Sequence, residues 1–236
     1  MLAQLSRELN TRIISIGIQS AIRNVVSCTQ LSPQILMSRY EVGNDPYLIP
    51  DTQVLRNKLG ISDSFALQEA EHEAAFQAAK DIQLFAPPFT FHQLCDLHRQ
   101  LFSQVYEWAG QERTIPMSRG SSRFAQPEFI KRECEKVYTN LNFVFAEVSR
   151  DEDSVGTMLA SAYADLNVAH PFRDGNGRSI RMHLEHVAFH LDYLLNWQSV
   201  NQAQWVKMSI ESMSDESSLV YWFSKNLIDI SPILDE

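Results

Sequence analysis

HPFRDGNGRSIR, residues 170–181, joins two segments with helical patterning, residues 153–170 and 179–195. Gly175 and Gly177 allow positive φ angles and leave the neighbouring backbone amides open, because glycine has no Cβ atom. The helix expected to begin near Arg178 presents further amides that have no partner within the helix. Together these amides favour an anion-binding turn suited to a pyrophosphate, although a short Gly-x-Gly sequence alone is weak evidence for one.

Two arginines strengthen the interpretation as an anion site. Arg178 and Arg181 are three residues apart, so we expect both on one face of the helix, close to its start. Guanidinium groups pair with phosphate oxygens through two parallel hydrogen bonds. The alternative is a solvated charged face, but two like charges at the positive end of a helix repel each other. The pair therefore favours a bound phosphate group.

An acid and a histidine complete this segment. Asp174 fits a Mg²⁺ ion held by one carboxylate and by substrate phosphates; its alternative role is to stabilise the turn. His170 comes at the end of the preceding helix, where a neutral imidazole can take a proton from an incoming hydroxyl. The alternative is a structural histidine at a helix end. We expect Phe172 to be buried beneath the loop.

The composition of the whole chain indicates a mostly helical protein. Its 236 residues are 44% hydrophobic and 21% charged, with only 8 glycines. The net charge of −9 excludes a broad basic footprint, so we expect no direct nucleic-acid partner. The cysteines, Cys28, Cys95 and Cys134, have no disulfide or zinc-ligand spacing, which is typical of a reducing, cytoplasmic environment. We expect neither a membrane span nor a signal peptide.

Hydrophobic periodicity and capping residues predict an all-α bundle. The expected helices cover residues 51–60, 61–85, 90–106, 126–148, 153–170, 179–195, 200–214 and 218–230. Residues 111–124 are irregular and are compatible with a β-hairpin. Residues 1–36 differ in character from the rest: either they form a helical extension, or the true first residue is Met37. We therefore predict one domain over residues 37–236, preceded by an N-terminal extension.

HPFRDGNGRSIR resembles the full signature of Fic-domain proteins, H-P-F-x-[D/E]-G-N-G-R-x-x-R, with no defining position missing. The resemblance extends over most of residues 40–225. NDPYLIPDTQVLRNKLG (44–60) is similar to the start of that fold, YEWAGQERTIPMSRGSSRFAQPEFI (106–130) to its Trp-Ala-Gly turn and hairpin flap, and LNWQSVNQAQW (195–205) to the stretch after the signature helices. It implies the Fic fold, a helical bundle with a small β-hairpin flap over the active site.

The resemblance also implies an activity, the transfer of AMP from ATP to a hydroxyl side chain of a target protein. In the family scheme His170 deprotonates that hydroxyl and Asp174 holds Mg²⁺, while the flap, about residues 115–124, clamps the target by strand-like pairing. The glycine turn and the two arginines bind the phosphates. The nucleotide-binding positions that the resemblance implies are Lys58, Leu59, Met117, Ser118, Arg119, Gly120, Gly175, Asn176, Gly177, Arg178 and Arg181.

The control of such an enzyme is implied by the same resemblance. Many relatives are blocked by a helix bearing [S/T]-x-x-x-E-[G/N], whose glutamate pairs with the second arginine, here Arg181. Residues 212–217, SMSDES, contain Ser-x-x-x-Glu but lack the final Gly or Asn, so Glu216 is a minor candidate for an internal inhibitor. A separate small antitoxin is favoured, which makes the chain the toxin of a toxin–antitoxin pair. In toxin-like relatives the targets include type II topoisomerases.

Three alternatives remain open. His183, His186 and His190 are spaced i, i+3 and i+7, so one helix face could hold zinc, although no H-E-x-x-H sequence is present. Relatives with an altered signature transfer phosphate or phosphocholine instead. A non-catalytic module that only binds a nucleotide or a partner is the third. The intact signature argues against the last two.

Overall fold

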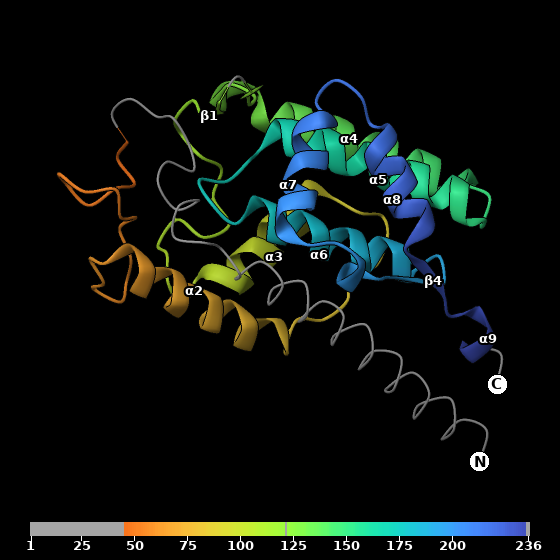
Figure 1. Ribbon diagram of the computed structural model, residues 1–236, viewed down its shortest axis with the longest axis horizontal. Coiled ribbons are helices and arrows are strands. Elements are labelled where there is room, and N and C mark those ends of the chain that lie inside the picture. Colours follow the sequence, from red (N-terminus) through yellow and green to blue (C-terminus); the bar gives the residue numbers. More distant parts are fainter. Residues whose placement is uncertain (1–44, 121, 235–236) are drawn as a thin grey trace, which may run out of the picture.

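The computed structural model describes residues 45–120 and 122–234, and the described part is mostly helical, as predicted (Figure 1). The question of residues 1–36 lies outside the described residues. In chain order the elements are α2 (Ser64–Ala79), α3 (Phe91–Phe102), β1 (Ser118–Arg119), β2 (Ser122–Arg123), the 3₁₀ helix η2 (Pro127–Phe129), α4 (Ile130–Glu147), α5 (Glu152–Ala169), α6 (Asn176–Phe189), β3 (Tyr193–Leu195), the 3₁₀ helix η3 (Trp197–Ser199), α7 (Gln202–Glu211), α8 (Ser217–Lys225), β4 (Leu227–Asp229) and α9 (Ser231–Leu234).

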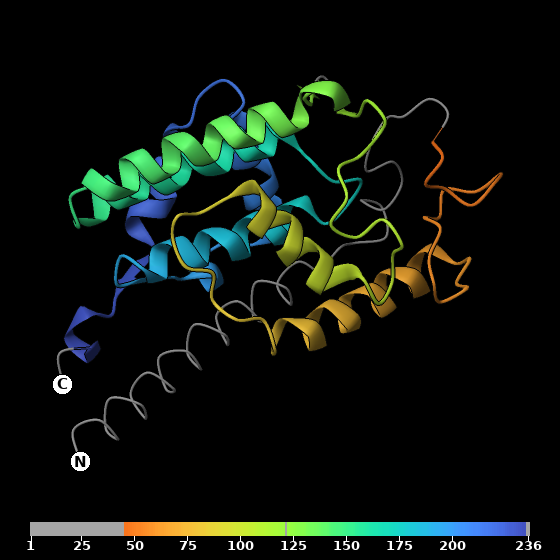
Figure 2. The same cartoon turned by 180° about the vertical axis from the view of Figure 1, so that it is seen from behind.

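The helix α5 is at the centre of the bundle. It packs against α4, α6 and α8, and α4 runs alongside it in both views (Figure 1, Figure 2). Its small residues allow close approach: Gly156 lies against the backbone of Ser224 in α8. On the other side of α6, α2 and α3 pack together around a second apolar cluster that includes Leu97 and Leu101. The bundle therefore places α6 between two apolar layers.

Side-chain caps explain where several helices begin. Thr90 accepts a hydrogen bond from the backbone of Gln93, whose side chain accepts one from Thr90 in return, so a capping box starts α3. Asp63 caps α2, and Asp151 caps α5. α3 and α5 begin within one residue of the expected position, whereas α2 begins at Ser64, three residues later than expected.

Four of the expected helices need correction. Residues 51–60 form turns rather than a short helix, and Asp51 adopts a left-handed φ of 59°. The helix expected over 61–85 ends at Ala79. The helices expected over 179–195 and 218–230 end early, and their last residues form the antiparallel strands β3 and β4, with Leu194 opposite Ile228. Asp192, with φ 68°, makes the turn that separates α6 from β3.

Two of the three cysteines lie in the part of the chain that the structure describes. Cys95 and Cys134 are buried and free, and burial raises the pKa of the Cys95 thiol to about 12, so both behave as small apolar residues. Within the described residues, no helix has the length and hydropathy needed to cross a membrane.

The contact between α5 and α8 predicts a sensitive position. A Cβ atom at residue 156 would lie 2.6 Å from the backbone nitrogen of Ser224 and 2.7 Å from its Cα atom. The variant Gly156→Ala should therefore lower the free energy of unfolding by about 1–3 kcal/mol, the usual cost of overpacking. Urea unfolding measures it. Thr157→Ala, at an exposed position of the same helix, is the control and should change stability by less than about 0.5 kcal/mol. Equal stability of the two variants would contradict the packing argument.

Candidate active site

His170 ends α5 in a left-handed conformation, with φ 46° and ψ 62°. A residue with a side chain reaches this region at a cost of about 1–3 kcal/mol, so surrounding contacts must hold it. Its N–H donates to the carbonyl of Leu166 (2.9 Å), and its own carbonyl accepts from Nε of Arg113 (2.8 Å). The imidazole stacks on the ring of Phe124 with 3.9 Å between centroids. The histidine is therefore fixed in place from both α5 and the flap.

The charge state of His170 follows from its surroundings. Burial lowers its pKa to about 3, and the positive charges of Arg113 and Arg119 act in the same direction. The ring is therefore neutral near pH 7. Its Nδ1 lies 3.2 Å from the carbonyl of Asn167, which can only accept a hydrogen bond, so Nδ1 carries the proton. The lone pair of the neutral ring is then on Nε2, the atom that can act as a base.

The loop that follows is closed by one side chain. The amide of Asn176 accepts from the N–H of Phe172 (2.8 Å) and donates to the carbonyl of the same residue (2.7 Å). Phe172 is fully buried, as expected, and Asn176 is 1% exposed. The side chain of Asn176 therefore stabilises the loop. The backbone amides of this residue and its neighbours are left to bind a phosphate.

Glycine is favoured at positions 175 and 177 for different structural reasons. Gly175 has φ 79°, and a Cβ atom there would lie 2.6 Å from the ring of Phe102. Gly177, for which the sequence also suggested a positive φ, lies within the regular helix α6. A Cβ atom at Gly177 would lie 3.2 Å from Nη1 of Arg181, so this glycine leaves room for the guanidinium.

His98 packs against the turn and stabilises it. It was not among the site residues predicted from the sequence. It is fully buried in α3, with Nδ1 accepting from the N–H of Gly110 (2.8 Å) and Nε2 placed 2.9 Å from the carbonyl of Asp174. Its ring stacks on Phe172 at 3.9 Å. A second support is the buried ion pair between Arg173 and Asp45, 2.7 Å long. Nothing in local spacing predicts these partners, which are distant along the chain.

Arg178 and Arg181 lie near the start of α6 but diverge. Arg178 pairs with Glu71 of α2 at 2.5 Å, and its guanidinium lies 4.5 Å from the ring centroid of Phe102. Arg181 lies over the rings of Trp197 and Trp205, at 5.7 and 5.8 Å. Different elements therefore cover the two arginines, because α6 is buried on several sides.

Glu71 is a second functional candidate that the sequence analysis missed. Its side chain is 6% exposed, and its carboxylate accepts a hydrogen bond from the hydroxyl of Tyr106 in addition to pairing with Arg178. Together, Glu71 and Asp174, which lies 3.8 Å from Nη2 of Arg178, place two carboxylates around one guanidinium. This arrangement holds Arg178 in one position within a nearly dry environment.

Asp174 fits a magnesium site of the kind completed by substrate phosphates. One carboxylate oxygen accepts from the N–H of Gly175 (2.6 Å), which fixes the side chain beside the anion-binding turn. Among the residues that the structure describes, no group of three or more His, Cys, Asp or Glu side chains could hold a metal. A single carboxylate beside a turn that could bind phosphate would suit Mg²⁺, which keeps waters and substrate oxygens as its other ligands.

The zinc alternative fails on geometry. Nδ1 of His183 bonds the hydroxyl of Tyr138 (2.8 Å), whereas His186 and His190 bond the backbone N–H and carbonyl of Phe85 (3.2 and 2.9 Å). The three rings therefore fasten two neighbouring segments onto α6. They do not form a common ligand set within the described part of the chain.

The predicted hairpin flap is confirmed. β1 and β2 are antiparallel, with Ser118 opposite Arg123 and Arg119 opposite Ser122, and Gly120 takes φ 57° in the turn between them. Met117 is buried in a small cluster with Ile115 and Phe124. Phe124 also stacks on His170, and Arg119 contributes to the lowered pKa of that histidine, so the flap lies beside the site.

Lys58 and Leu59 precede α2. The N–H of Lys58 donates to the carbonyl of Val105 (2.8 Å), and its ammonium group lies 3.4 Å from Glu107. Leu59 is 46% exposed, so it offers an apolar surface to solvent. Their expected place near the adenine stays a prediction.

Glu216 lies in a different environment from the one that an internal inhibitor needs. Burial and the Asp165 carboxylate raise its pKa, against a smaller effect of the Ser161 hydroxyl. A carboxylate paired with an arginine would have its pKa lowered. The described structure therefore gives no support to Glu216 as the partner of Arg181.

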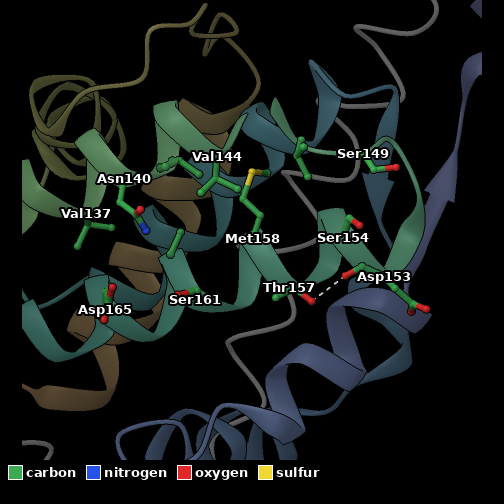
Figure 3. Close-up of a pocket in the computed structure, with 13 residues that line it drawn as sticks. Val137, Asn140, Val144, Ser149, Asp153, Ser154, Thr157, Met158, Ser161 and Asp165 are labelled. Atoms are coloured by element: carbon green, nitrogen blue, oxygen red, sulfur yellow. Dashed lines mark hydrogen bonds between the residues drawn. The ribbon is translucent and has the colours of Figure 1, made fainter. Parts of the chain in front are cut away.

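A separate groove runs between α4 and α5 (Figure 3). It has a volume of about 580 Å³, with Val144 and Met158 among its apolar lining and Asp153 and Asp165 among its polar lining. No site residue predicted from the sequence lines it. Volume alone is therefore a poor guide to the chemistry of this protein.

Comparisons with known proteins agree with the geometry. The Fic/DOC family matches residues 88–188. The chain is 32% identical over 191 residues to a Salmonella typhimurium protein named "Probable protein adenylyltransferase Fic", covering 80% of this chain and 96% of that one. An Escherichia coli protein of the same name is 30% identical over 191 residues, with the same coverage.

A solved structure extends the comparison to the fold. The N-terminal Fic domain of a VirB-translocated Bep effector protein from Bartonella quintana, with bound ADP, superimposes with a TM-score of 0.70 at 25% identity. The match covers 80% of this chain and 98% of the other. The bundle is that of a Fic domain, and the similarity to protein adenylyltransferases makes the chain a nucleotidyltransferase. The chain belongs to the Fic/DOC family.

The ion pair between Glu71 and Arg178 predicts a measurable coupling to ATP. Glu71→Gln leaves the buried guanidinium without its closest carboxylate, which should destabilise the substrate-free protein by about 3 kcal/mol. Added ATP should restore part of this loss, since phosphate oxygens can replace the carboxylate. Thermal unfolding with and without ATP and Mg²⁺ measures both effects. Glu69→Gln, exposed on the same helix, is the matched control. A larger ATP stabilisation of the wild type than of Glu71→Gln would contradict this account.

The buried histidines predict acid sensitivity. Burial lowers the pKa of His98, His170 and His183 to about 3 and that of His186 to about 4. Each ring stays neutral in the folded state while the unfolded chain takes up protons below pH 6.5, so stability is complete above pH 6.5 and falls with pH. At pH 5.5 each histidine should cost about 1.4 kcal/mol.

Urea unfolding at pH 7.5 and 5.5 tests this dependence. His183→Gln should weaken it by the contribution of one site, whereas His92→Gln, at an exposed position of α3, should leave it unchanged. Equal wild-type stability at the two pH values would show that these rings are not buried in the neutral form.

Proposed function

We propose that this protein transfers AMP from ATP to a hydroxyl side chain of a target protein. The observation that carries the proposal is the neutral His170 placed directly before an anion-binding turn. The ATP part is supported by the ADP found in the Bartonella quintana domain. The protein-acceptor part is supported by the names of the Salmonella typhimurium and Escherichia coli relatives.

The proposed step is a single displacement at the α-phosphorus of ATP. The acceptor oxygen forms a bond to this phosphorus as the bond to the β-phosphate oxygen breaks, and pyrophosphate leaves. The hydroxyl proton passes to Nε2 of His170, since Nδ1 already carries a proton donated to Asn167. Most of the catalysis then comes from positioning and from charge stabilisation, as in other phosphoryl-type transfers.

The turn and the two arginines receive the triphosphate in this scheme. The backbone amides of Asn176 and Gly177, at the start of α6, would face the phosphates, while Gly175 makes the turn and gives its own N–H to Asp174. Arg178 and Arg181, which diverge, approach the β- and γ-phosphates from different sides. Asp174 is the residue that would hold Mg²⁺, whose charge offsets that of the phosphates when it is bound.

The flap receives the target protein. β1 and β2 form a sheet of two strands, so an extended target segment can add to its edge through backbone hydrogen bonds. This pairing would place an acceptor hydroxyl beside His170, because Phe124 at the end of the flap stacks on that ring. Ser118, Arg119 and Gly120 would then lie between the segment and the nucleotide, and the buried Met117 would contribute through its backbone.

Control by a separate small antitoxin is part of the proposal. Its motif would supply the glutamate that pairs with Arg181, a role for which the surroundings of Glu216 are unfavourable. We place this toxin–antitoxin pair in the cytoplasm, with type II topoisomerase subunits as the first targets to test. A neighbouring small reading frame that encodes [S/T]-x-x-x-E-[G/N] would support control in trans.

Labelled ATP tests the reaction. With Mg²⁺ and bacterial lysate, α-³²P-ATP should label protein and γ-³²P-ATP should not, because only the AMP part is transferred. His170→Ala should lower the rate by at least about 100-fold, the usual contribution of a general base, while ATP binding persists. His92→Ala, an exposed histidine of α3, is the matched control.

Each other outcome of this experiment has a definite meaning. Label from γ-³²P-ATP would indicate phosphate transfer, and a wild-type rate in His170→Ala would remove this residue from the mechanism. ATP binding without label from either position would favour the non-catalytic alternative.

A further inference from the structure

Arg113 is a charged residue that is almost completely buried in the described structure. It lies between the Trp-Ala-Gly turn and the flap, and it is 2% exposed. Removing a guanidinium from water costs several kcal/mol unless its donors are well paired. The burial of this guanidinium therefore indicates that its hydrogen bonds have a specific structural role.

The contacts of Arg113 join three separate parts of the site. Nε donates to the carbonyl of His170 (2.8 Å), and Nη2 donates to that of Ala125 (2.5 Å) and, at 3.4 Å, to that of Ala169. Nη1 donates to the carbonyl of Ile115 (2.6 Å). The backbone N–H of Arg113 donates to the carbonyl of Pro171 (2.8 Å).

The positions of these carbonyls explain the arrangement. Ala169 and His170 end α5, where unpaired carbonyls carry the negative end of the helix dipole and attract a cation. Ile115 and Ala125 lie on either side of β1 and β2, so they are the two ends of the flap. One rigid, planar group thereby links the left-handed histidine to both ends of the hairpin.

We propose that Arg113 is a positioning residue that fixes the flap relative to His170, so that a target hydroxyl paired to the flap arrives at the base. This inference rests on the proposed AMP transfer. Arg113 touches the backbone around the site, and its role is to hold two groups in register. Lysine cannot replace it, because an ammonium group lacks the planar fork that reaches several carbonyls at once.

The rigid link and the charge of Arg113 can be tested separately. Arg113→Lys keeps the charge but loses the fork, so the amides of Phe124 and Ala125 should exchange with solvent faster, while the pKa of His170 stays low. Arg113→Gln also removes a charge that lowers this pKa, so the pKa should rise. Hydrogen exchange and NMR titration of the histidine ring measure these two effects. Arg132→Gln, at a solvent-exposed arginine of α4, is the control for both.

Label transfer from α-³²P-ATP gives the functional readout. Arg113→Lys should lower the rate by about 100-fold, as expected for a small misplacement of reacting groups, with unchanged affinity for the ATP analogue AMPPNP. A folded Arg113→Lys protein with wild-type exchange and wild-type transfer would overturn the inference. So would a loss of AMPPNP binding that accounts for the whole loss of transfer.

A measurement on the wild type guards against variants that do not fold. If Arg113 links the elements, the amides of Phe124, Ala125 and His170 should open together and show similar protection from exchange. Much faster exchange of the flap amides than of His170 would refute the link. A wild type that binds AMPPNP but transfers no label would refute the proposed function, while the exchange and titration data would still decide the role of Arg113.

Discussion

The site depends on how the chain passes from α5 into α6 within a few residues. Two left-handed residues, His170 at φ 46° and Gly175 at φ 79°, make the bends at either end of the loop. The side chain of Asn176 bridges the backbone of Phe172 and closes it. The carbonyl end of α5 therefore leads within a few residues into the amide end of α6, and this turn brings His170 close to the first backbone amides of α6.

Three buried arginines at this junction are each paired with oxygen atoms that carry negative charge or partial negative charge. Arg113 donates hydrogen bonds to the carbonyls at the end of α5, and Arg178 forms an ion pair with the carboxylate of Glu71. Arg173 takes Asp45. Such pairs add little net stability, since desolvation consumes most of the attraction, but they allow few alternative geometries. The surroundings of the site therefore supply rigidity, which a reaction that depends on positioning requires.

Local signals in the sequence predicted what local contacts determine. The caps Asp63, Thr90 and Asp151 each lie directly before the helix that they begin, and the helical bundle was predicted from such local signals. The flap was implied by the resemblance to the Fic signature, because local signals indicated only an irregular segment. The strands β3 and β4 were not predicted, because their stability comes from pairing between distant segments. Glu71 and His98 were missed for the same reason: their partners in the turn are 107 and 76 residues away.

The low pKa of His170 also suggests why the nucleotide should bind before the acceptor hydroxyl reacts. Without substrate, burial and two nearby arginines hold the ring neutral but make it a weak base. In the proposed reaction, a triphosphate at the adjacent turn would bring negative charge, and negative charge near an imidazole raises its pKa. Nucleotide binding would thus strengthen the proposed base. Because the lone pair of the substrate-free ring is already on Nε2, this strengthening needs no change of tautomer, only the arrival of charge.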